Sequence, residues 1–219
     1  MIGREKGCPA PKVLSRGRGG ALLKNPELAR DIFRAVRDAV DVPITVKLRT
    51  GWDSSEQSRE DFWRICEYMA DAGADAIVIH GRTVKEYYRG TADWDMVSQV
   101  KKRFPHCNII GSGDVFDAEQ AVKTVRQTGV DGAIVARGAI GNPWIWPRLR
   151  SFWHGTEPPA EPHLHEVGEV MLRHFELTLT MKDEYKPVRF LRKFLTGYCK
   201  RHPSRNKAQL ELMDAKEHS

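Results

Sequence analysis

The 219-residue sequence has few cysteines and no pairs of them. The four cysteines are far apart and form no CxxC motif: Cys8, Cys66, Cys107 and Cys199. Structural zinc sites and disulfide-stapled scaffolds both depend on sets of cysteines with defined spacings, so the sequence argues against both. His163 and His165 have no third ligand beside them, and we expect no metal site. A reducing compartment, the cytoplasm, is the expected location.

Long apolar runs are also missing. The mean hydropathy is −0.50, and no apolar stretch approaches the roughly 18 residues that cross a bilayer. The first ten residues carry charges without an apolar segment behind them, which does not match a secretory signal. We therefore expect a protein without a membrane partner.

Positive charge is concentrated near the C-terminal end. The whole chain has a net charge of +6, whereas residues 173–207 contain ten Lys or Arg and three Asp or Glu, a net of +7. Such a segment favours a polyanionic partner. A solvated helix face explains the same charges equally well, so composition alone leaves both interpretations open.

Apolar β-rich segments alternate with helical patterns through the first three quarters of the chain. We expect strands to start near residues 44, 76, 108 and 132, with helices between them. The strands are continuous apolar runs, as in parallel strands covered on both faces. This pattern predicts an α/β fold, either an open sheet or a closed barrel. Four such units make half of an eight-stranded barrel.

A Pro-rich segment then separates a second region. Residues 1–155 are expected to form the βα part, 156–162 a linker, and 163–219 a small basic helical domain with a polar tail. Apolar residues at helical spacing predict one helix after residue 163 and another around 188–198. The chain from Lys200 onward is expected to be frayed.

Polar residues follow each expected strand. Ligands of parallel βα folds bind at the carboxyl ends of the strands. Lys47 and Arg49 lie on one side of the first strand, and His80 ends the second. Glycine-rich turns at 111–114 and 136–143 can cradle a phosphate. A structural histidine and purely steric glycines remain open alternatives.

Cys8 lies between Gly7 and Pro9 and is followed by a glycine-rich turn at 17–20. Nearby cations can tune a loop thiol as a proton donor or nucleophile. An ordinary loop cysteine fits the same residues, and the pattern alone does not decide between them.

Together these segments resemble the tRNA-dihydrouridine synthase family. The matching segments are GCPAPKV (7–13), ALLKNP (21–26), VKLRTG (46–51), HGRT (80–83), GTADW (90–94), GD (113–114) and RGAIGNPW (137–144). The resemblance implies a partial (β/α)8 TIM barrel, about strands 4/5 to 8, followed by a C-terminal helical tRNA-binding domain. It also implies FMN as cofactor, NADPH as reductant and uridine in tRNA as substrate.

The resemblance further implies roles for individual residues. Cys8 would protonate C5 of the uracil ring after hydride reaches C6. Seven residues would bind FMN, the first two at its ring: Lys47, His80, Ser112, Gly113, Asp114, Ala136 and Arg137. Five would contact the substrate or tRNA: Arg49, Arg82, Arg189, Arg192 and Lys193.

The sequence also departs from the family. The resemblance implies that the family's first three barrel strands are missing from this sequence, and residues 2–6 are too polar for a buried fourth strand. Glu5, Ser112 and Gly20 replace the family's Asn, Asn and Ser. We therefore expect an N-terminally truncated chain that self-associates through its open sheet edges. A non-catalytic RNA-binding remnant and another FMN-dependent pyrimidine reductase are the alternative functions.

Overall fold

The structure is a computed structural model that describes residues 2–5, 7–181 and 186–214. The chain divides into two compact units. The first contains the residues up to 115 and residues 120–135, and the second contains residues 116–119 and the chain from 136 onward. Among the described residues, no helix is long and apolar enough to span a bilayer.

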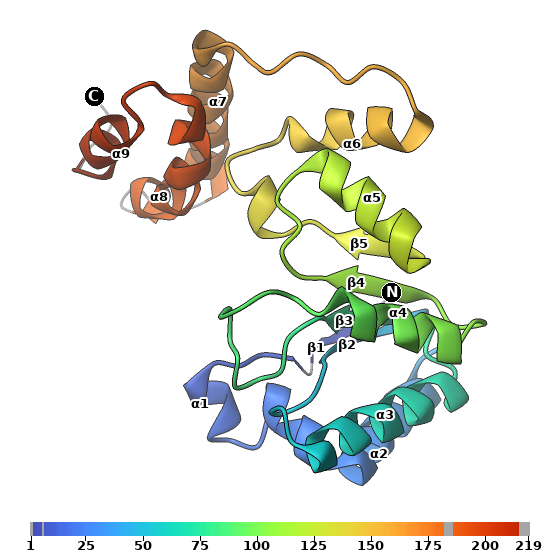
Figure 1. The fold of residues 1–219 in the computed structure, drawn as a ribbon. Coiled ribbons are helices and arrows are strands. Elements are labelled where there is room, and N and C mark those ends of the chain that lie inside the picture. The colour runs from blue at the N-terminus through green and yellow to red at the C-terminus, as the bar shows by residue number, and fades with distance from the viewer. Residues whose placement is uncertain (1, 6, 182–185, 215–219) are drawn as a thin grey trace. The chain divides into compact units, whose positions relative to one another are not determined.

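A parallel five-stranded sheet forms the centre of the first unit (Figure 1). Its strands follow one another in chain order: β1 (Ile2–Glu5), β2 (Ile44–Arg49), β3 (Ala76–His80), β4 (Ile109–Ser112) and β5 (Gly132–Ile134). The four strands predicted from residue 44 onward are confirmed. Residues 2–5 also pair with β2, and their polar composition fits an edge strand, which needs less apolar surface than a central one.

Helices connect the strands, as expected for βα units. They are α1 (Pro11–Leu14), η1 (Gly19–Lys24), α2 (Pro26–Ala39), α3 (Glu56–Asp71), α4 (Trp94–Arg103) and α5 (Ala118–Thr128). Helix α3 begins at Glu56, directly after its cap. The side chain of Ser55 caps it by accepting a hydrogen bond from the Ser58 amide at 3.3 Å, a preferred N-cap arrangement.

One face of this sheet carries the hydrophobic core. Alternate strand residues contribute Ile44, Val46, Leu48, Ile77, Ile79 and Ile109. Helices α2, α3 and α4 contribute Phe33, Phe62, Ile65, Met69, Val97 and Val100. Because side chains alternate along a strand, the residues between these apolar positions point to the opposite face of the sheet.

The second unit is helical. It contains η2 (Arg137–Ala139), α6 (Ile145–His154), α7 (Leu164–Met181), α8 (Lys186–Tyr198), η3 (Cys199–Arg201) and α9 (Arg205–Asp214). Helices α7 and α8 agree with the predicted pattern, and a hydrogen bond of 3.0 Å joins His174 to the hydroxyl of Tyr198. The boundary between the units falls after Val135, earlier than the expected linker at 156–162.

The expectation of a frayed chain after Lys200 is wrong for residues 205–214, which form α9. Gln209 of α9 donates a hydrogen bond to the hydroxyl of Thr196 on α8 at 3.2 Å. This polar sequence has little apolar periodicity of its own, so its helix depends on a neighbour that the sequence pattern does not reveal.

A close backbone contact holds α8 against the turn after η2. A Cβ atom on Gly197 would lie 1.8 Å from the carbonyl oxygen of Ile140. We expect Gly197→Ala to destabilise the protein by about 3 kcal/mol because neither backbone can move without repacking. Urea unfolding followed by circular dichroism measures the change.

Gly168→Ala is the matched control, since a Cβ there meets nothing within 4 Å. Alanine at this half-buried position of α7 should stabilise the helix by up to about 1 kcal/mol. Equal unfolding midpoints for the two variants would show that the contact at Gly197 contributes nothing.

Candidate active site at the carboxyl ends of the strands

Polar side chains lie in register across three neighbouring strands. Arg49 of β2 pairs in register with His80 of β3, which pairs with Ser112 of β4. All three are buried, and alternation places them on the sheet face opposite the hydrophobic core. Lys47 lies two residues before Arg49 on the same face and is half-buried. The structure thus brings four of the predicted site residues together at one end of one face.

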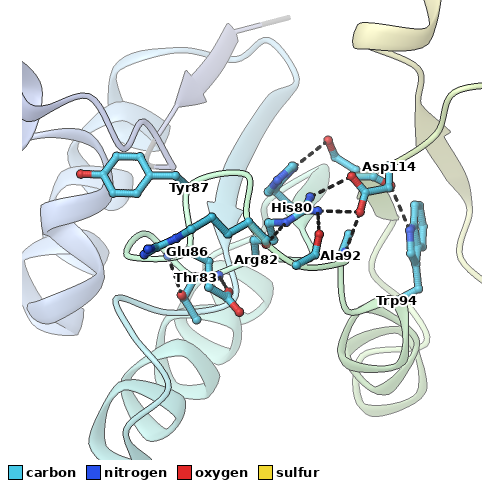
Figure 2. Close-up of polar contacts among 12 residues, drawn as sticks. His80, Arg82, Thr83, Glu86, Tyr87, Ala92, Trp94 and Asp114 are labelled. Carbon is cyan, nitrogen blue, oxygen red and sulfur yellow. Dashed lines mark hydrogen bonds and ion pairs between the residues drawn. The ribbon is translucent and has the colours of Figure 1, made fainter.

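The imidazole of His80 is held in place by its neighbours. Its Nδ1 lies 3.3 Å from the hydroxyl of Ser112, an interaction drawn in Figure 2. The ring of Tyr88 approaches it edge-on, with 6.3 Å between ring centroids. These contacts fix the plane of the imidazole at the strand ends. Tyr88 was not among the predicted site residues, and its only sequence signal is its place between HGRT and GTADW.

The side chain of Arg49 donates hydrogen bonds to three backbone carbonyls. Its Nε donates to the carbonyl of Gly7 at 3.0 Å, and its Nη1 donates to the carbonyls of Thr83 and Tyr87 at 2.9 and 2.8 Å. Tyr87 has a φ of +55°, an unusual conformation for an aromatic residue. The expected contact of Arg49 with substrate or tRNA stays a prediction. In this structure its guanidinium fastens the segment before Cys8 to the loop after β3.

The loop that carries Cys8 also packs against a glycine turn. The carbonyl of Cys8 accepts a hydrogen bond from the Gly20 amide at 3.0 Å. Gly19 has a φ of +57°, and a Cβ there would lie 2.9 Å from that carbonyl. A Cβ on Gly20 would lie 2.5 Å from Cγ2 of Val84, so a larger residue at position 20 would have to displace Val84. The thiol of Cys8 itself is partly exposed.

We expect Arg49→Met to loosen this loop. The variant removes three hydrogen bonds from a charged donor, each worth more than a neutral one. Alkylation of Cys8 by iodoacetamide, followed by mass spectrometry of its peptide, should become about tenfold faster as the loop opens more often. Arg59→Met, at an exposed position of α3, should leave the rate unchanged. An unaltered alkylation rate in Arg49→Met would contradict the positioning role.

A buried ion pair connects the ends of β3 and β4 (Figure 2). Arg82 is 2% exposed, and its two terminal nitrogens donate to the two carboxylate oxygens of Asp114 at 2.9 and 2.7 Å. Arg82 also donates to the carbonyls of Arg89 and Gly90, at 2.9 and 2.7 Å. Asp114 accepts a further hydrogen bond from the Ala92 amide at 2.7 Å.

These contacts give both residues positions that the sequence did not indicate. Arg82 was predicted to contact substrate or tRNA, but its guanidinium lies inside the protein and holds the loop at 83–93. Asp114 was predicted at the FMN phosphate, but its carboxylate bonds to Arg82. The adjacent Gly113 has a φ of +127°, which favours glycine, and its carbonyl accepts a hydrogen bond from the indole of Trp94 at 3.0 Å.

The remaining predicted residues belong to the second unit. Ala136 precedes η2, and the guanidinium of Arg137 lies 4.9 Å from the ring centroid of Phe116. On α8, Arg189 and Lys193 are exposed and Arg192 is half-buried. These residues therefore belong to a different unit from Lys47, Arg49, His80 and Ser112, which share one face of the sheet in the first unit.

The other cysteines do not resemble reactive thiols. Burial raises the pKa of the thiols of Cys66, Cys107 and Cys199, so they stay protonated. Cys8 alone belongs to the loop fastened to the strand ends. No group of three or more His, Cys, Asp or Glu suited to a metal occurs in the described part of the chain.

A family model and individual relatives of this chain carry matching descriptions. A family model described as dihydrouridine synthase matches residues 2–219. The chain is 37% identical to a probable tRNA-dihydrouridine synthase of Mycobacterium leprae, across 90% of this chain and 52% of that protein. It is 35% identical to tRNA-dihydrouridine synthase B of Shewanella oneidensis, across 94% of this chain and 62% of that protein. The chain thus spans about half to three fifths of the length of these relatives.

Proposed function

Because the chain belongs to the dihydrouridine synthase family, we propose that it reduces the C5=C6 bond of uridine in tRNA, using FMN and NAD(P)H. The observation that carries the proposal is the arrangement of Arg49, His80 and Ser112 in one row, with Lys47 on the same face and Arg49 bonded to the residue before Cys8. In this proposal the five parallel strands are part of a (β/α)8 barrel.

The chemistry of this face fits a flavin. The ring of FMN carries oxygen and nitrogen acceptors, and the ammonium of Lys47 and the imidazole of His80 offer donors to them. In this proposal the turn at Ser112 and Gly113 lies beside the flavin; a Cβ on Gly113 would lie 2.6 Å from Cβ of Ala92, so glycine lets the turn pack closely there. Ala136 and Arg137 would hold the phosphate group. When bound, FMN supplies the hydride that C6 of the uracil ring accepts, and NAD(P)H reduces the flavin again.

The chain's own residues donate the proton and hold the loops around the reacting groups in position. Cys8 donates its thiol proton to C5 as general acid, and its partial exposure lets solvent return that proton. Arg49 keeps the cysteine loop at the strand ends, and the pair of Arg82 with Asp114 holds the neighbouring loop. We assign both arginines to positioning. The uridine must leave its base stack to reach this face.

The basic segment supports an RNA substrate. Arg189, Arg192 and Lys193 lie on α8, within the stretch of net charge +7 at residues 173–207. Contacts between such cations and phosphates dominate RNA affinity and release counterions, so binding should weaken as salt increases.

A direct assay tests the proposal. The 219-residue protein is incubated with FMN, NADPH and unmodified tRNA, and dihydrouridine is measured by mass spectrometry of the digested RNA. Free uridine serves as the second substrate. Dihydrouridine in tRNA alone supports the proposal, and reduction of free uridine at a similar rate would instead indicate a reductase of small pyrimidines. A protein that binds tRNA and FMN but forms no dihydrouridine would overturn the proposed activity of this chain.

A further inference from the structure

The loop between β3 and α4 presents Tyr87 at the carboxyl ends of the strands. This residue is 40% exposed, although its backbone is bonded on both sides. Its amide donates to the carbonyl of Val84 at 3.2 Å, and its carbonyl accepts from Arg49 at 2.8 Å. We propose that the ring of Tyr87 stacks on a nucleobase of the RNA next to the uridine that is reduced. This inference deepens the proposed function and rests on it.

The backbone of Tyr87 has an unfavourable conformation. Its φ of +55° lies in the left-handed region, where a Cβ atom crowds the following carbonyl and glycine or asparagine is the usual residue. Among the described residues, Asp114 is the other non-glycine with a positive φ, and its carboxylate bonds to Arg82. Strained residues gather where a site needs one particular side chain. Tyr87 exposes an aromatic ring at the strand ends, where the substrate arrives.

The surrounding loop is fastened at several points, so the ring starts from a fixed backbone. The amides of Val84 and Lys85 donate to carbonyls in the segment after β2, at 2.9 and 3.0 Å. The buried guanidinium of Arg82 donates to the carbonyls of Arg89 and Gly90 at the far end of the loop. A base that stacks on a side chain from an ordered loop pays less for ordering that loop on binding.

The two tyrosines of this loop point to different places. The ring of Tyr88 lies edge-on to His80, with 6.3 Å between centroids, and the guanidinium of Arg49 lies 5.7 Å from the same ring. Figure 2 shows the ring of Tyr87 pointing away from His80 and Asp114. Tyr87 therefore lies beside the row of site residues and not over it. That position suits a nucleotide next to the reacting uridine better than the uridine itself.

The chemistry of an exposed tyrosine suits such a nucleotide. When a uridine leaves its base stack, the neighbouring base loses a stacking partner. An aromatic side chain can replace that partner, as it does in other proteins that bind unstacked RNA. Such stacking tolerates any base, because every base has a π face. Tyr87 thus adds affinity for RNA without restricting which nucleotide adjoins the uridine.

The test compares variants of Tyr87 in tRNA binding. Tyr87→Gly removes the ring and the backbone strain, Tyr87→Asn removes the ring with a residue that tolerates this φ, and Tyr87→Phe keeps a ring. Val42→Ala is the control, because Val42 is 42% exposed and lies two residues before β2, at the opposite end of the strands. Each variant is titrated with unmodified tRNA, and its thermal unfolding is followed by circular dichroism.

We expect Tyr87→Gly and Tyr87→Asn to bind tRNA about tenfold more weakly, within the range for losing one stacked base. Tyr87→Phe and Val42→Ala should bind within about twofold of the unaltered protein. The melting midpoint of Tyr87→Gly should stay close to that of the unaltered protein, since relief of the strained φ offsets the added freedom of the unfolded chain.

Unchanged affinity in Tyr87→Gly and Tyr87→Asn would overturn the inference, and so would an equal loss in Tyr87→Phe. A loss of affinity that follows a falling melting midpoint from variant to variant would indicate a collapsed loop and would also overturn it. These measurements need no turnover. A protein that shows the expected binding pattern but forms no dihydrouridine would overturn the proposed activity alone.

Discussion

Replacing Cys8 by alanine is expected to lower the rate of dihydrouridine formation by about 10²–10⁴-fold, the usual contribution of a general acid. The physical reason is that alanine has no proton to give to C5 of the uracil ring. FMN binding should be unchanged, because the expected flavin contacts lie on the strand face and on the turns after β4 and β5. The measurement is dihydrouridine yield per bound flavin, with flavin quantified by absorbance.

Cys107→Ala provides the control for the loss of a thiol. Cys107 is half-buried beside the core, and its sulfur lies 3.8 Å from the carbonyl oxygen of Ala74. This variant should keep the activity of the unmodified protein. A Cys8→Ala protein that retains both flavin and full activity would remove Cys8 from the mechanism.

Asp114→Asn is expected to destabilise the first unit by about 3 kcal/mol. The amide cannot neutralise Arg82, so a guanidinium that is 2% exposed would stay buried without its carboxylate. Breaking a fully buried pair costs about 3–5 kcal/mol, and the 23% exposure of Asp114 places this pair at the lower end. Urea unfolding measures the difference in free energy of unfolding.

A surface pair gives the comparison. Glu67 lies 3.7 Å from Arg103, and both side chains are about half exposed. Glu67→Gln should change the free energy of unfolding by less than about 1 kcal/mol, as solvent-exposed pairs do. Similar losses in Asp114→Asn and Glu67→Gln would mean that the Arg82 pair does not hold the strand ends together.

The sequence predicted most elements of the first unit because its signals there are local. Strands β2 to β5 are apolar runs, and Asn25 and Asp93 cap the helices that follow them. Helices α6 and α9 were missed. Helix α9 has almost no apolar periodicity, and its contact with Thr196 joins residues 13 positions apart.

The sequence indicated which residues form the candidate site, but it did not indicate which atoms they bond to. The expected order of parallel strands predicts that Lys47, Arg49 and His80 lie near the carboxyl ends of neighbouring strands. The residue type of Arg49 does not say that it bonds to Gly7, 42 residues away. The partner of Arg82 is 32 residues away. Such pairings depend on how the loops fold over the strand ends, which periodicity and motifs do not encode.

The most direct test is a crystal structure of the protein with FMN and a uridine-containing RNA. We predict that the flavin ring contacts Lys47 and His80. We also predict that the sulfur of Cys8 lies about 3.5 Å from C5 of the uracil, a reactive distance, on the face opposite the flavin. A flavin bound away from these two residues, or a Cys8 sulfur turned from the base, would contradict the account.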